Sequence, residues 1–176
     1  MDMATFPFKV NESMPGPSIT GGIDLDHLLG QRFMDTDGKV FMLVKTGASC
    51  AAVRKRVFKW TSRSAYTVQL GTAETEQCAG AGVSDHQDTS TLASGYYLLL
   101  QRGGRATVTH GDDGTNVAAS GKPYLTISGD TDTGKIEGVA TASLTTEAPD
   151  VVFGIYVSGT GGDDADIVCD LILARV

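Results

Sequence analysis

"ASGYYLLLQRGGRATVTHGDDG", residues 93–114, is the stretch that decides the fold class of this chain. An apolar run opens after a turn glycine, breaks at Gly103-Gly104 and resumes as small alternating residues, a pattern typical of a β-hairpin. We expect its two strands at Tyr96–Gln101 and Ala106–His110. Because side chains alternate between the two faces of a strand, the apolar side chains of the first strand fall on both faces, and both should be buried.

A strand that is buried on both faces needs a cover on each side, which is unusual in so small a domain. One cover would come from another subunit through an oligomer contact, although a loop or the short helix of the same chain could also supply it. The residues that we expect at the oligomer contact are Tyr96, Tyr97 and Leu99.

Outside this stretch the sequence repeats the same alternation of strands and turns. Apolar or alternating runs of strand length occur at 39–45, 53–60 and 65–70, and a short pairing segment is expected near Val83. Later strands are expected at Tyr124–Ile127, Ile136–Ala142, Val151–Val157 and Ile167–Ala174. The sequence therefore predicts an all-β fold, a small β-sandwich or barrel-like domain, with one short helix that ends at Gly30.

The first 22 residues differ from the rest of the chain. They include "SMPGPSITGG", which cannot hold a helix because proline removes backbone donors and glycine costs entropy. They also carry apolar side chains that a solvated tail would not need. We therefore expect an extended N-terminal arm at 1–22 that lies on a neighbouring subunit, followed by a single β-rich domain at 23–176; a disordered terminus is the alternative. The expected anchors of the arm are Phe6, Phe8, Met14 and Ile19.

Composition sets limits on the class of protein. The chain has 176 residues, of which 41% are hydrophobic, which suits one domain with a core of its own. No apolar run approaches the roughly 20 residues that span a bilayer, and the first residues lack a signal peptide, so we expect synthesis in a cytoplasm and no membrane partner. The widely spaced cysteines predict buried, reduced thiols rather than a zinc site: Cys50, Cys78 and Cys169.

The charge of the chain is distributed unevenly. Up to Leu70 there are nine lysines and arginines against six acidic residues, whereas the remainder has five against fifteen. This acidity argues against nucleic acid as a partner, although the basic run at 53–60 interleaves charges with aromatic side chains. We expect the cations of this run to contact an acidic surface on another subunit or to remain solvated: Arg54, Arg56 and Lys59.

Motifs that carry chemistry are not found in the sequence. His86 lies in "SDHQD" with serines nearby, but there is no GxSxG, GxxxxGK[ST] or GxGxxG pattern to support catalysis or nucleotide binding. Four turns are rich in aspartate and raise calcium as an alternative, yet none has the spacing of an EF-hand, and aspartate is common in turns. We predict no catalytic residue, no cofactor and no metal.

The order of features from Ala81 to Ser143 resembles the head decoration, or capsid cement, proteins of tailed phages. In those proteins a Gly-Val step precedes a turn glycine and an aromatic strand that ends in glutamine near a glycine. A strand of small residues follows, then a glycine three residues before a leucine, a turn of Asp, Thr and Gly, a second step of Gly, Val or Ile, and Ala, and a final Val-rich strand. The corresponding residues are Gly82-Val83, Gly95, Tyr96–Gln101, Gly103-Gly104, Ala106–Val108, Gly121, Leu125, Gly138-Val139-Ala140 and Ile167–Leu173.

The resemblance implies a function without catalysis. Such proteins commonly sit as trimers over symmetry positions of the expanded shell, where they bridge subunits of the major capsid protein. The implied location is the capsid surface of a virion, after synthesis in the host cytoplasm. A different class stays open from the residues alone, namely a β-sandwich adhesin or carbohydrate-binding module, for which exposed rings at Tyr96, Tyr97 or Trp60 would be evidence.

Overall fold

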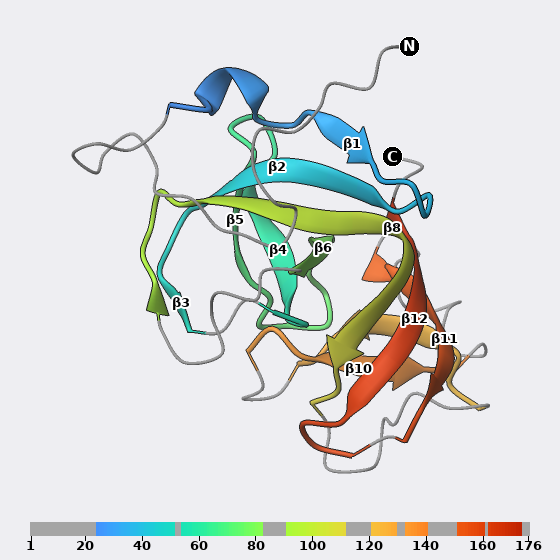
Figure 1. Cartoon of the computed structure of the whole chain (residues 1–176). Helices are drawn as coiled ribbons and strands as arrows, with labels where there is room; N and C mark the ends of the chain where they lie inside the picture. Colours follow the sequence, from blue (N-terminus) through green and yellow to red (C-terminus); the bar gives the residue numbers. More distant parts are fainter. Residues whose placement is uncertain are drawn as a thin grey trace.

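The computed structural model describes residues 24–51, 54–82, 91–111, 121–129, 133–140, 151–160 and 162–173. Within these ranges the regular secondary structure consists of β-strands and a turn of 3-10 helix (Figure 1). The elements are η1 (Asp26–Leu28), β1 (Arg32–Met34), β2 (Val40–Thr46), β3 (Cys50–Ala51), β4 (Val57–Ser62), β5 (Thr67–Leu70), β6 (Cys78–Gly82), β7 (Thr91–Leu92), β8 (Tyr97–Thr109), β9 (Tyr124–Ile127), β10 (Ile136–Val139), β11 (Gly154–Gly159) and β12 (Asp166–Ile172).

Five of these strands close into a barrel. The ten-stranded sheet has the order β1-β2-β5-β4-β6-β8-β12-β11-β9-β10. Strand β2 also pairs with β8, which closes the run from β2 to β8 into a ring. Strands β2, β5, β4, β6 and the first half of β8 therefore form a closed ring, the N-terminal barrel. The predicted all-β, barrel-like fold is confirmed, and the expected short helix is the single 3-10 turn η1.

The predicted hairpin at residues 96–110 is wrong. The segment forms one continuous strand, β8, whose first half pairs with β2 and β6 and whose second half pairs with β12. Figure 1 shows β8 crossing beside β2 and then turning down along β12. Gly104 lies in the bend with a φ of +79°, a conformation that side chains disfavour, so the two glycines bend the strand rather than end it.

The second half of β8 begins another curved layer, the C-terminal sheet, which continues through β12, β11, β9 and β10. This sheet curls back on itself, because His110 at the end of β8 forms a parallel bridge with Ile136 of β10. The two parts of the fold are also joined directly, since the backbone N–H of Val57 donates to the carbonyl of Gly134 at 2.7 Å. Strand β8 belongs to both the N-terminal barrel and the C-terminal sheet.

Three clusters of buried side chains follow from this arrangement. The N-terminal barrel encloses Phe58, Leu98, Leu100 and their neighbours, whereas Phe153, Ile167 and their neighbours fill the C-terminal sheet. A third cluster lies on the outer side of β2 and β8, where Phe41, Leu43, Tyr97 and Leu99 are covered by Leu25 and the half-buried Leu28, Leu29 and Phe33. The chain's own N-terminal segment therefore supplies the second cover of the apolar strand.

Other strand boundaries differ from the expected ones for local reasons. The strand expected from residue 53 begins at Val57, because Arg54 and Lys55 form a turn in which Lys55 has a φ of +61°. The pairing segment expected near Val83 is β6 (Cys78–Gly82), and Val83 itself lies outside the described residues. The three cysteines are free and buried, as predicted. Within the described residues no helix is long and apolar enough to cross a membrane.

Candidate functional site

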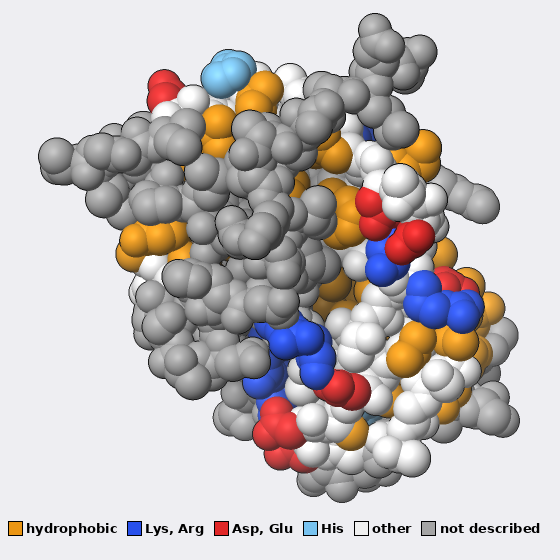
Figure 2. All heavy atoms as spheres, in the orientation of Figure 1, with side chains coloured by type: hydrophobic (Ala, Val, Ile, Leu, Met, Phe, Trp, Pro, Cys, Tyr) orange, Lys and Arg blue, Asp and Glu red, His pale blue; other side chains and the backbone are white. Residues whose placement is uncertain are grey.

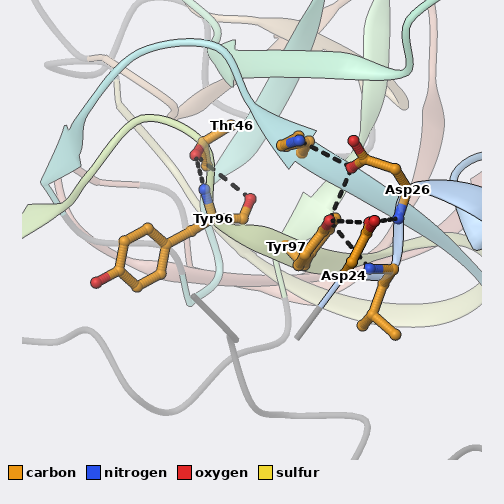
Figure 3. A network of polar contacts seen from close by, with 7 residues as sticks. Asp24, Asp26, Thr46, Tyr96 and Tyr97 are labelled. Atoms are coloured by element: carbon orange, nitrogen blue, oxygen red, sulfur yellow. Dashed lines mark hydrogen bonds and ion pairs between the residues drawn. The ribbon is translucent and has the colours of Figure 1, made fainter. Parts of the chain in front are cut away.

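The segment Asp24–Leu28, which we call the arm root, is fixed to the domain by a polar network around Tyr97 (Figure 3). The hydroxyl of Tyr97 donates to Oδ1 of Asp26 at 2.7 Å and accepts the backbone N–H of Leu25 at 3.0 Å. Nζ of Lys45 on β2 lies 2.8 Å from Oδ1 of Asp26 and 5.3 Å from the centre of the Tyr97 ring. The network determines where the chain enters the domain from residues 1–23.

The charges in this network reinforce one another. Hydrogen bonds from Lys45 and Tyr97 lower the pKa of Asp26 below its ordinary value of 3.8. Burial, together with the adjacent carboxylate of Asp26, raises the pKa of Tyr97 to about 12. At neutral pH the network therefore contains an ionised Asp26 and a neutral Tyr97 hydroxyl that acts as a donor to the carboxylate.

Replacing Lys45 by methionine is expected to raise the pKa of Asp26 toward 3.8, because the largest lowering contribution is removed. Since the folded-state pKa is below that of the unfolded chain, Asp26 contributes stability above about pH 4 and loses it as the pH falls through the lowered value. Titration of the Asp26 carboxyl carbon by NMR measures the effect. Lys55→Met, which removes the partner of Asp166 instead, is the control; an equal pKa in the Lys45 variant would contradict the assignment.

The four expected anchors of the arm, Phe6, Phe8, Met14 and Ile19, lie outside the described residues, as does the whole segment 1–22. The arm and its contacts therefore stay a prediction. The arm root shows which strands lie beneath the point at which the chain enters the described part, namely β2 and β8.

The predicted oligomer residues separate into two groups. Tyr97 and Leu99 are 1% and 3% exposed in the cluster under the arm root, so an intrachain contact takes the place of the expected contact with a partner. Tyr96 is half-buried and its ring points away from Tyr97, as Figure 3 shows. Its backbone N–H donates to the Thr46 hydroxyl at 2.8 Å, and that hydroxyl donates to the carbonyl of Ala93 at 2.8 Å, which fixes the turn before β8.

The basic run meets acidic side chains of the same chain. Arg56 lies 3.6 Å from Asp164, and Lys59 forms an ion pair with Glu76. These pairs connect β4 and the turn before it to acidic side chains of the sequence after Leu70. Arg54 is exposed in the turn before β4. A contact of Arg54, Arg56 or Lys59 with another subunit stays a prediction.

Acidic turns have structural roles where the structure describes them. Oδ1 of Asp35 accepts the backbone N–H groups of Asp37 and Lys39 at 3.0 and 2.8 Å, which closes the turn between β1 and β2. Asp163 lies 2.6 Å from Nζ of Lys135, whose hydrogen bond lowers the pKa of that carboxyl. Among the described residues no group of three or more His, Cys, Asp or Glu side chains is placed to hold a metal ion.

An outward-facing apolar group on β11 and β12 was missed by the sequence reasoning. Ile155, Val157 and Ile172 are 40%, 37% and 41% exposed. Ile155 lies opposite Asp170, which pairs with Arg105 of β8 at 3.1 Å, so charged and apolar side chains alternate on this outer face. In Figure 2 hydrophobic and charged side chains adjoin over the part of the molecule that β11 and β12 occupy in Figure 1. The signal was present, because the run at 151–157 is apolar at successive positions.

No family model and no curated protein matches the chain. Among solved structures the chain is similar to the N base of head fiber gp8.5 of bacteriophage phi29, with 16% identity and a TM-score of 0.44 over 76% of this chain and 94% of that one. It is also similar to a chain of the capsid of Myoviridae phage XM1, with 11% identity and a TM-score of 0.47 over 98% of each chain. Both proteins are parts of phage heads, and the likeness concerns the fold alone.

Proposed function

We propose that this chain is a non-enzymatic structural protein of a phage virion, which binds the outer surface of the expanded capsid and stabilises it by bridging subunits of the major capsid protein. The observation that carries the proposal is the order of sequence features that resembles head decoration proteins. Its central part, from Gly95 through Gly103-Gly104 to Val108, coincides with β8 and the turn before it. The resembling residues thus form the strand that both parts of the fold share.

The proposed mechanism is selective binding to one state of the shell. A protein that binds only the expanded lattice stabilises that lattice in proportion to the difference in affinity between the two states. A body in which two β-layers share one strand loses little conformational freedom on binding, so more of the contact energy remains as affinity. An arm that leaves this body at the arm root would add contacts to a neighbouring subunit. Because the arm and the body are linked, binding of one raises the effective concentration of the other at its own contact.

We further propose that the chain assembles with copies of itself, as a homotrimer. With Tyr97 and Leu99 buried under the arm root, the half-buried Tyr96 and the exposed group of Ile155, Val157 and Ile172 are the described side chains that best suit such contacts. Interfaces between separately folded subunits have an apolar core surrounded by a polar rim, and the three exposed apolar side chains would suit such a core.

The adhesin alternative requires aromatic rings that are accessible to a sugar. Tyr97 is buried, and Tyr96 and Trp60 are half-buried against the barrel core, which favours the structural role over a stacking platform built from these three rings. The two roles are separable by experiment, because a stacking platform binds uncharged glycans in the absence of a shell, whereas a cement protein requires the assembled shell.

Deleting Met1–Gly22 is expected to leave a folded oligomer that binds expanded heads at least about tenfold more weakly, because the arm contacts are lost while the arm root from Asp24 onward remains. The measurement is cosedimentation with expanded, undecorated heads of the phage that encodes the chain. Circular dichroism and light scattering report whether fold and oligomer persist. Binding equal to that of the full chain would place the capsid contact outside the arm, and unfolding would place the arm in the core.

A further inference from the structure

A pocket of about 280 Å³ opens between β1, β4, β8 and the turn that follows β4. It is distinct from the arm root, and its walls combine positive charge with aromatic and sulfur-containing side chains. Among the residues that the structure describes, none of the side chains that line it is acidic. The residues that define its chemistry are Arg32, Arg63, Arg102, Trp60, Tyr66 and Met42.

Arg102 is the unusual member of this group, because its side chain is buried without an acidic partner. The residue is 6% exposed, and its Nε has no hydrogen-bond partner. Nη1 lies 3.7 Å from the Met42 sulfur, a weak acceptor, and the guanidinium carbon lies 5.7 Å from the centre of the Trp60 ring. A buried cation is costly unless it is paired. The site therefore favours any ligand that brings a negative charge to Arg102.

The neighbouring cations strengthen this preference. Burial lowers the pKa of Arg102, and the nearby guanidinium groups of Arg32 and Arg63 lower it further by repulsion. Arg63 is exposed in the turn after β4, where Nη2 donates to the side-chain oxygen of Gln77. Three guanidinium groups line this pocket, and a carboxylate matches the planar fork of donors of one guanidinium with two parallel hydrogen bonds.

The size and the walls of the pocket indicate what carries the anion. A volume of about 280 Å³ is near the lower end for small-molecule sites. An aspartate or glutamate side chain, or an inorganic phosphate, would leave most of it unfilled. Tyr66 forms part of the wall with its ring packed on the backbone of Gly30, where a Cβ would lie 2.2 Å from the ring. The rings of Tyr66 and Trp60 line the pocket beside the guanidinium groups, and this combination suits a ligand with both apolar and polar faces.

We propose that this pocket binds the carboxylate of an acidic sugar, with Arg102 at its base and Arg32 and Arg63 at its rim. The inference goes beyond the proposed capsid role and does not depend on it. A protein on the surface of a virion would in this way hold a ligand of monosaccharide size in addition to its contacts with the shell.

The test uses the full chain and the fluorescence of Trp60, the single tryptophan of the sequence, which lines the pocket. Glucuronate and N-acetylneuraminate are titrated beside glucose, which has a similar ring without the carboxylate. We expect a saturable change in fluorescence with both acids and none with glucose. Arg102→Met and Arg63→Gln should each weaken binding of the acids by about tenfold or more. Arg105→Met, on the outer face of β8, should bind as the wild type does.

Arg63→Gln keeps the test decisive if Arg102→Met fails to fold, because Arg63 is exposed in a turn. The proposal is overturned if neither acid gives a saturable change, or if glucose binds as tightly as glucuronate. It is also overturned if inorganic phosphate or an acidic peptide binds more tightly than both sugar acids, since either result would assign the pocket to another ligand. Arg102→Met should still cosediment with expanded heads. Failure of the sugar-acid proposal and failure of the capsid role can therefore be distinguished.

Discussion

Replacing Phe153 by alanine is expected to lower the free energy of unfolding by about 3–5 kcal/mol. Phe153 is completely buried at the centre of the C-terminal sheet cluster, and its backbone bonds to both neighbours of β11, with its N–H donating to Leu125 and its carbonyl accepting from Ile172, each at 3.0 Å. Removal of the ring leaves a cavity that the two flanking strands cannot close, because both are fixed in register.

The loss should reach the N-terminal barrel as well. Strand β8 is common to both parts, and the carbonyl of Gly134 before β10 accepts the N–H of Val57 on β4. The midpoint of urea unfolding followed by Trp60 fluorescence should therefore fall together with the midpoint followed by circular dichroism, although Trp60 packs on the other cluster. Ile155→Ala, which trims a 40% exposed side chain on β11, should change the midpoint little.

If the Trp60 transition of Phe153→Ala stayed at the wild-type midpoint while the circular dichroism transition moved, the two parts would unfold independently. That result would contradict the shared-strand description of the fold, in which β8 carries the pairings of both parts.

Gly80→Ala is the second substitution with a large expected effect, a loss of about 2–6 kcal/mol. Gly80 has a φ of +154° in the fully buried strand β6, and a Cβ there would lie 2.8 Å from the carbonyl oxygen of Gln101 and 2.9 Å from Cβ of Leu100. Backbone strain and overpacking each cost about 1–3 kcal/mol, and the contacting atoms belong to the neighbouring strand β8, which cannot move without breaking the barrel.

Chemical denaturation of purified Gly80→Ala measures this loss. Gly121→Ala is the matched control, because a Cβ at Gly121 would meet nothing within 4 Å. Equal midpoints for the two variants would show that β6 and β8 are not packed as closely as described. A loss confined to Gly80→Ala would support the closed N-terminal barrel.

The sequence predicted the kind of fold better than the connections within it. The runs at 39–45 and 124–127 became β2 and β9 because alternating or apolar patterns of strand length require no knowledge of partners. The Gly103-Gly104 pair predicts a turn, since paired glycines commonly end strands. Whether such a pair reverses the chain or bends it depends on which strands lie beside it. Here Gly103 pairs with Val40 of β2 and Gly104 pairs with Leu171 of β12, and both partners are distant in sequence.

The candidate site could be predicted only in part for the same reason. The sequence shows that Tyr97 and Leu99 lie in an apolar run. Whether another subunit or the arm root covers them depends on the tertiary position of Leu25, which the sequence does not give. The pairing of Lys59 with Glu76 and the convergence of three arginines around Trp60 likewise arise from strand order. No spacing in the sequence reveals them.

The proposed capsid role is best tested by a binding isotherm of the full chain on expanded, undecorated heads beside unexpanded proheads of the same phage, followed by heating of the bound and free heads. We expect saturable binding to expanded heads, little or no binding to proheads, and bound heads that withstand a higher temperature than free ones. Absence of binding to expanded heads at micromolar concentration, or equal binding to both states with no gain in heat resistance, would contradict the proposed role.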